Sequence, residues 1–258
     1  MTSRMPTVFI GHGSPMNAVE LNTHTSAWRA LGESLPKPKA ILAISAHWYA
    51  NGTAVTAMTQ PRTIHDFYGF PSELFAQRYA APGSPALASR VQELLGPVPV
   101  AADQQWGLDH GTWSVLTHVY PQADIPVVQL SIDATLSNAA HYELGAQLAA
   151  LRDEGVLIFG SGNVVHNLRR IQWNPSAAGW PWATTFNDGI REALARGDHQ
   201  FAIDYEQLGE DARLAVPTPE HYLPLLYVLG AGGAQSEVSF PTDGIELGSI
   251  SMLTVLCS

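Results

Sequence analysis

Four short, continuous apolar runs constrain the fold of this chain more than any other feature. They cover residues 7–10, 40–45, 126–131 and 156–159 and are rich in valine, isoleucine and leucine. Uninterrupted runs of this length are typical of strands that are buried on both faces of a parallel sheet. The pattern therefore predicts a largely parallel sheet at the centre of the molecule.

Segments with helical periodicity separate these runs. Residues 137–154 carry leucines at helical spacing, with Ser137 as the expected N-cap and Gly155 as the stop. Residues 22–36 predict a second crossover helix, and residues 248–257 predict a final strand. The alternation predicts an α/β fold with a mixed, mostly parallel central sheet and helices on both faces. In such folds ligands bind beyond the carboxyl ends of the strands.

We expect one domain over residues 1–258. No linker rich in proline, glycine or serine divides the chain, and 46% apolar against 14% charged residues is enough for a large core. No apolar stretch is long enough to span a bilayer, and residues 1–13 lack the apolar segment of a signal peptide. The single cysteine, Cys257, allows no intrachain disulfide, so we expect a cytoplasmic protein.

The net charge restricts the possible partners. Thirteen lysines and arginines against 23 acidic residues give a formal charge of −10. Nucleic-acid backbones and anionic membrane surfaces attract cationic proteins. The charge therefore argues against both a nucleic-acid partner and a membrane anchor.

The placement of the histidines indicates a site. His12 follows the first expected strand, and His47 ends the second, 35 residues later, which fits one strand–helix–strand crossover between neighbouring strands. His166 follows the fourth strand after a glycine-rich turn and leads into an expected helix. Imidazole suits zinc or iron where no thiolate is present, so three rings at one rim of the sheet predict a metal or catalytic site. The alternative is three ordinary loop histidines with hydrogen bonds of their own.

Two further histidines stand where helices are expected to start. His221 follows two prolines in an exposed first helical turn, from which it can face a pocket or solvent. His110 lies in a polar turn before a helix over residues 112–120, where a base or substrate contact is one interpretation. His65 lies in an aromatic-rich segment that we interpret as a packed surface loop. The other four histidines are interpreted as structural or solvent-facing: His24, His118, His141 and His199.

Six phrases occur in a fixed order along the chain: GHGSPMNA, ISAHWY, IHDFYGFPSELF, LDHGTWSVL, GSGNVVHNLR and PEHYLPL. In this order they resemble the DODA-type family of extradiol ring-cleaving dioxygenases, within the LigB-like class III superfamily. The resemblance runs from Thr7 to the C-terminus. It implies a single α/β catalytic domain that holds one mononuclear non-haem metal, Fe(II) for activity, with Zn(II) possible in the purified protein.

The resemblance also implies a ligand set for the metal. His12 and His47 match two histidine ligands of the family, and His221 matches a further ligand position of the DODA-type branch. The wider superfamily uses a glutamate as the third ligand. Glu220, next to His221, therefore stays open as an alternative.

Two histidines match catalytic positions by the same resemblance. His166 matches the acid–base catalyst, or an additional ligand when zinc is bound, and His110 matches a histidine beside the substrate and oxygen. The expected reaction is cleavage of the ring of a DOPA-like catechol by O2 to a semialdehyde, with proton transfer at His166. The partners would be these two small molecules. A zinc-dependent hydrolase with the same histidines and a non-catalytic binding protein are the alternatives.

Two more groups of residues are candidates for contact with such a substrate. The aromatic wall of the pocket is expected from Trp48, Phe67, Tyr68 and Trp113. Basic residues that could pair with a substrate carboxylate are Arg62, Arg169 and Arg170.

Overall fold

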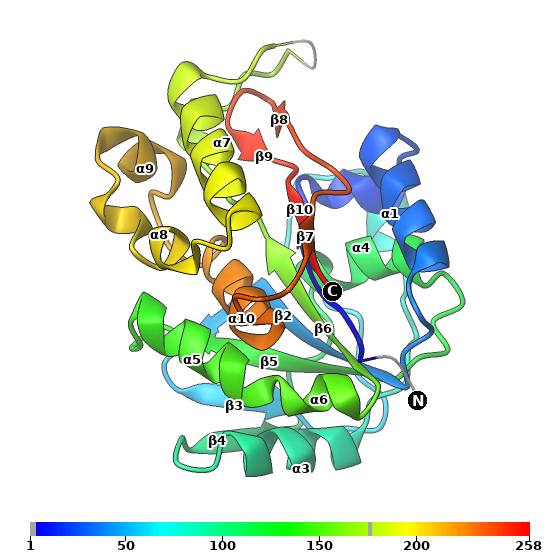
Figure 1. Ribbon diagram of the computed structural model, residues 1–258. Coiled ribbons are helices and arrows are strands. Elements are labelled where there is room, and N and C mark those ends of the chain that lie inside the picture. The colour runs from blue at the N-terminus through cyan, green and yellow to red at the C-terminus, as the bar shows by residue number, and fades with distance from the viewer. Residues whose placement is uncertain (1–3, 175–176) are drawn as a thin grey trace.

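The computed structural model describes residues 4–174 and 177–258 and has an eight-stranded mixed sheet at its centre (Figure 1). The strands of this sheet are β1 (Thr7–Gly11), β2 (Ala40–Ala50), β3 (Thr53–Thr56), β4 (Val100–Asp103), β5 (Val127–Asp133), β6 (Val156–Gly162), β7 (Val238–Ser239) and β10 (Thr254–Cys257). Their order is β4-β3-β5-β2-β6-β1-β10-β7. The three central pairs are parallel, whereas β10 runs antiparallel to β1 and β7. The expected mixed, mostly parallel sheet is confirmed.

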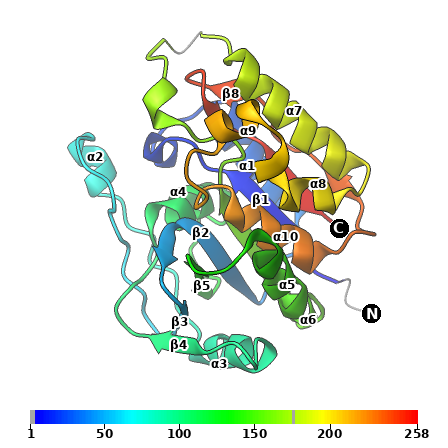
Figure 2. The same ribbon diagram turned by 90° about the vertical axis from the view of Figure 1, so that its left-hand side faces the viewer.

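Helices cover both faces of the sheet (Figures 1 and 2). They are α1 (Thr23–Ser34), α2 (Ser72–Phe75), α3 (Pro85–Leu94), α4 (His110–Val119), α5 (Asn138–Leu148), α6 (Ala150–Asp153), α7 (Pro181–Ala195), α8 (His199–Ile203), α9 (Glu210–Ala215) and α10 (Leu223–Gly232). Short 3-10 turns lie at Pro15–Ala18, Leu168–Arg170 and Tyr205–Gln207. Helices α5 and α10 pack together on one face, and α1 and α4 pack together on the other.

Alternate residues of the central strands enter two separate hydrophobic cores. In β1, Val8 and Ile10 face the core beneath α1 and α4, whereas Phe9 faces the core beneath α5 and α10. All three side chains are at most 1% exposed. Burial of both faces explains why these strands are continuous apolar runs in the sequence.

The helix expected over residues 137–154 and the final strand expected over residues 248–257 are confirmed with small changes. The Ser137 hydroxyl accepts a hydrogen bond from Ala140 N at 3.3 Å, so it caps α5 as expected. The helix is interrupted at Ala149, where α5 gives way to α6. The strand expected over residues 248–257 is divided into β9 (Ile250–Ser251), which pairs with β8 (Ile245–Glu246), and β10.

The expected order of the first two strands is wrong. β6 lies between β1 and β2 and pairs in parallel with both. All three strands run in the same direction, so their carboxyl ends still lie at one edge of the sheet. His12 and His47 therefore reach the same region from opposite sides of β6.

Two glycines allow α5 and α10 to approach closely. A Cβ added to Gly145 would lie 2.3 Å from Tyr227 O, and one added to Gly230 would lie 2.0 Å from Tyr142 O. Neither distance is compatible with a real side chain, so the packing requires glycine at both positions. Helix α10 is the most apolar helix of the fold, with ten residues. Within residues 4–174 and 177–258, no helix has the length and apolar character needed to cross a membrane.

We expect Gly230→Ala to lower the free energy of unfolding by about 1–3 kcal/mol, because the added methyl group overpacks the α5–α10 contact. Gly189→Ala is a matched control, since Gly189 is also helical but an added Cβ would meet nothing nearer than 3.9 Å. There alanine should be neutral or stabilising by up to about 1 kcal/mol. Urea unfolding followed by circular dichroism measures the free energy of unfolding of both variants. Equal free energies for Gly230→Ala and Gly189→Ala would contradict this packing.

Candidate functional site

Five histidines line one cavity at the carboxyl edge of the sheet, with a volume of about 610 Å³. His12 follows β1, His47 lies within β2, and His166 follows β6. His110 is the first residue of α4, and His221 precedes α10 by two residues. The structure thus brings together all five histidines that the sequence singled out for the site.

Three of these rings turn one nitrogen each toward a common point. The candidate ligand atoms of His12, His47 and His221 all lie within 4.8 Å of one another. The Nε2 atoms of His12 and His47 are 3.3 Å apart. Two nitrogens that bind one ion at about 2.1 Å lie roughly 3.0–3.4 Å apart at ordinary coordination angles. The spacing therefore fits a single metal ion between the rings.

The other nitrogen of His12 is held by a serine. His12 Nδ1 lies 2.9 Å from the Ser161 hydroxyl, which donates its hydrogen to Gly111 O. A hydroxyl has one hydrogen, so Ser161 must accept from His12 Nδ1–H. The lone pair of the neutral ring is then on Nε2, the atom that faces the other two histidines.

Carboxylates hold the other two rings in the same way. His47 Nδ1 lies 3.2 Å from Asp66 Oδ2, and His221 Nδ1 lies 3.2 Å from Glu220 Oε1. An acceptor at Nδ1 fixes both the tautomer and the orientation of a metal-binding histidine. All three rings are therefore preset to offer Nε2, which is the observation that makes this cluster fit a metal.

Burial keeps the three converging rings neutral. It lowers the pKa of His12 and of His221 well below the ordinary value, and the neighbouring histidines lower both further. The pKa of His47 is lowered to about 3, mainly by burial and by the proximity of His110, against the opposing charge of Asp66. Neutral imidazole is the form that binds metal, so the site can accept a cation at neutral pH without losing a proton first.

Asp66 is a site residue that the sequence analysis missed. Its Oδ2 lies 3.0 Å from His110 Nδ1 as well as beside His47, and its Oδ1 accepts from His110 N at 2.9 Å. Burial alone would raise the pKa of Asp66, but its contacts with the two histidines lower it to about 2, so the carboxylate stays charged. The only sequence signal for Asp66 was its place in the phrase IHDFYGFPSELF.

His166 differs from the three converging rings. It stacks on His221, with ring centroids 3.5 Å apart and planes 7° apart. It belongs to a second cluster of possible ligands, with Glu220 and His221. Burial and the neighbouring His110 lower the pKa of His166 to about 4. Its ring lines the same cavity, beside the three converging rings.

Two expectations about local structure are wrong. His221 is only 7% exposed, because its carbonyl accepts from Asn163 N at 2.8 Å and lies against Gly162, where a Cβ would come within 2.1 Å. The turn before α10 is thus folded onto the end of β6 and does not form an exposed helical turn. The helix expected after His166 is only the 3-10 turn Leu168–Arg170.

The expected aromatic wall is largely wrong. Of the four candidates, only Tyr68 lines the cavity, and Phe67 is not among the lining residues. Trp48 stacks on Trp106 beside a different hollow, and Trp113 is buried in the core. The other aromatic and aliphatic residues that line the cavity are Phe70, Leu168, Ile171, Trp173, Leu247 and Ile250.

The remaining candidates lie outside the cavity. None of the three arginines expected near a substrate carboxylate lines it. His65 contacts Gln77 O at 3.0 Å within a packed loop, as expected. His24 does not line the cavity, but its Nε2 lies 3.1 Å from Glu246 Oε1. Three further histidines are buried on helices as structural residues: His118, His141 and His199.

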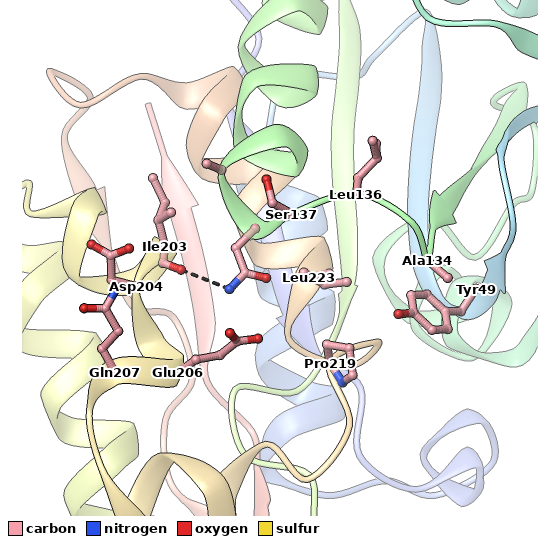
Figure 3. A pocket seen from close by; sticks show the side chains of 12 residues that line it. Tyr49, Ala134, Leu136, Ser137, Ile203, Asp204, Glu206, Gln207, Pro219 and Leu223 are labelled. Atoms are coloured by element: carbon pink, nitrogen blue, oxygen red, sulfur yellow. Dashed lines mark hydrogen bonds between the residues drawn. The ribbon is translucent and has the colours of Figure 1, made fainter.

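A second hollow lies at the start of α5, and Figure 3 shows its side chains. Asn138 lines it and donates a hydrogen bond to Ile203 O at 3.1 Å. Pro219 lines this hollow two residues before His221, but none of the ten histidines does. The chemistry-bearing side chains are therefore gathered in the other cavity.

Comparison with known proteins agrees with this geometry. Residues 4–252 match the family model described as the catalytic LigB subunit of aromatic ring-opening dioxygenase. The chain belongs to the LigB family. It is 53% identical to 4,5-DOPA dioxygenase extradiol of Escherichia coli K12, over 98% of this chain and 95% of that protein. It is 44% identical to 4,5-DOPA dioxygenase extradiol of Beta vulgaris, over 95% of this chain and 93% of that protein.

A solved structure extends the likeness to the fold of this LigB-family protein. The crystal structure of an uncharacterized protein from Escherichia coli K12 superposes with a TM-score of 0.87 at 49% identity. The superposition covers 99% of this chain and 100% of the chain in the crystal structure. The resemblance drawn from the six sequence phrases is therefore confirmed.

We expect Asp66→Asn to weaken metal binding about 10- to 100-fold, because an amide cannot accept from the Nδ1 atoms of both His47 and His110 with the strength of a carboxylate. Competition for Zn(II) against a colorimetric chelator measures the affinity. Glu73→Gln, an exposed position on α2, is the control for the loss of one negative charge nearby. Equal affinities of the two variants would show that Asp66 does not support the ligand ring.

Proposed function

We propose that this LigB-family protein is a metal-dependent extradiol dioxygenase that cleaves the ring of a DOPA-like catechol with O2 and yields a semialdehyde. The observation that carries the proposal is the set of three rings whose candidate ligand atoms lie within 4.8 Å of one another, in a cavity of about 610 Å³, with an oxygen acceptor near each Nδ1. The names of the two relatives support a catechol and O2 as the small-molecule partners.

His12, His47 and His221 would hold the metal. Non-haem iron oxygenases commonly use two histidines and a carboxylate on one side of the ion, with open positions on the other. Here the Glu220 carboxylate contacts the ring of His221 and does not line the cavity, which favours His221 as the third ligand. Fe(II) suits the activity, and Zn(II) suits the same nitrogen ligands in purified protein. When bound, Fe(II) would bring catechol and O2 together and transfer electrons between them.

His166 and His110 would handle the protons. The neutral ring of His166 lines the cavity and can take a proton from one catechol hydroxyl, then return it as the ring opens. The Nδ1 of His110 is held by Asp66, so its Nε2 is free to accept a hydrogen bond from the second hydroxyl. One residue would then move the proton while the other orients the ring.

We also propose that residues 1–258 form one catalytic domain, because strands from both ends of the chain, β1 and β10, are neighbours in one sheet. A cytoplasmic location is supported by the cysteine content. Cys257 is buried and is the only cysteine, so the fold does not depend on an oxidising compartment.

Oxygen uptake tests the proposed reaction. Protein loaded anaerobically with Fe(II) should consume O2 when DOPA is added and form a yellow ring-opened product, and Zn(II)-loaded protein should not. Ester or amide hydrolysis by the zinc form without oxygen would indicate the hydrolase instead. Binding of catechols without any turnover, at full iron occupancy, would indicate a binding protein.

Variants separate the proposed ligand from the proposed acid–base residue. His12→Ala should lose bound iron, because it removes an Nε2 ligand. His166→Ala should keep iron and lose about 100-fold or more in kcat, because proton transfer is lost. Iron content by mass spectrometry and kcat by oxygen uptake are measured on the same samples, with His199→Gln as a histidine control outside the cavity. Loss of iron from His166→Ala would make His166 a ligand.

A further inference from the structure

Three residues form a row along one wall of the cavity. Glu246 in β8 pairs with Ile250 in β9, and Ile250 pairs with His166 on its other side. Paired residues of antiparallel strands point to the same face of a sheet, and all three side chains line the cavity. The Cα atoms of paired residues are about 4.5–5.5 Å apart, so the Cα atom of Glu246 lies roughly 10 Å along the wall from that of His166.

Glu246 is the single acidic residue among the described residues that line this cavity, and no lysine or arginine is among them. Arg62, one of the arginines expected near a substrate carboxylate, instead donates to Trp106 O at 3.1 Å. Apart from the histidines, most of the other residues that line the cavity are apolar, Leu247 and Trp173 among them. A negatively charged substituent at this end of the cavity would therefore be repelled, and a positively charged one would be attracted.

His24 orients this carboxylate. Its Nε2 lies 3.1 Å from Glu246 Oε1, and the side chain of His24 is 14% exposed against 37% for Glu246. His24 does not line the cavity and contacts one of the two carboxylate oxygens. Glu246 itself lines the cavity, so its carboxylate can contact a ligand there.

We propose that Glu246 selects, among catechols, those whose side chain ends in a protonated amine. The inference rests on the proposed function, because it requires the catechol hydroxyls to lie near His166 and the converging histidines. A ring held there with a short aliphatic side chain spans the row to Glu246, and the ring and methylene groups lie along Ile250. Glu246 is thus a specificity-determining residue at the far end of the site.

Charge-matched substrates test this selection. Dopamine carries the amine alone, dihydrocaffeate carries a carboxylate alone, and DOPA carries both groups. The measured quantity is kcat/KM for each, divided by that for neutral 4-methylcatechol on the same preparation. We expect dopamine to be preferred over dihydrocaffeate by about tenfold or more, with DOPA between them. A charge pair at a half-exposed position changes affinity by a few-fold. The ratio combines attraction of the dopamine amine with repulsion of the dihydrocaffeate carboxylate, so the two effects multiply.

Substitutions at Glu246 should change this ratio. Glu246→Gln should lower the dopamine preference about tenfold, and Glu246→Lys should reverse it. The ratio is internal to one preparation, so a partly unfolded variant does not alter it. Glu192→Gln makes the same change in net charge on the exposed side of α7 and should leave the ratio as in the wild type. An unchanged ratio in Glu246→Gln, or an equal change in Glu192→Gln, would overturn the proposal.

A binding measurement keeps the inference separate from the reaction. Trp173 lines the cavity, so quenching of tryptophan fluorescence under anaerobic conditions reports binding of each compound without turnover. If no catechol consumes oxygen, the proposed function fails, and the ratio of dissociation constants still tests the charge preference. If catechols are turned over without a preference for the amine in either measurement, only the role of Glu246 fails.

Discussion

The contact between each imidazole Nδ1 and an oxygen behind it is the interaction on which the site depends. Three different acceptors make this contact: the Ser161 hydroxyl, the Asp66 carboxylate and the Glu220 carboxylate. Without them the rings could rotate or adopt the other tautomer, and the Nε2 lone pairs would no longer meet. The fold therefore has to position the oxygens as accurately as the histidines.

The central place of β6 in the sheet supplies one of these oxygens. β6 separates β1 from β2, and its Ser161 holds His12 on one side while donating to Gly111 in α4. A Cβ at Gly111 would lie 2.5 Å from Ser45 Oγ and 2.8 Å from His47 Cδ2. The start of α4, the end of β6 and the ring of His47 are therefore packed as one unit, and a glycine is required where they meet.

The sequence predicted what local patterns encode. Continuous apolar runs predicted β1, β2, β5 and β6, and the ends of three of these strands placed His12, His47 and His166 at one edge of the sheet. The order of β1, β6 and β2 could not be predicted, because parallel strands are joined by distant crossovers that leave no local signal of neighbourhood. Asp66 was missed for a related reason, since its contacts are made by a loop that returns to the sheet from elsewhere. The row from His166 to Glu246 likewise depends on strand pairing between residues about 80 positions apart.

The pairing of β10 with β1 has a consequence for the timing of synthesis. β1 is made first, yet it stays unpaired along one side until Thr254–Cys257 has left the ribosome. Gly11 N also donates to Leu253 O at 2.9 Å, so this late segment adds to the contacts with β6 that fix the backbone before His12. Such distant contacts form slowly, after local helices. The converging histidines therefore come together only late in synthesis, because His221 and the segment that pairs with β1 both lie in the last part of the chain.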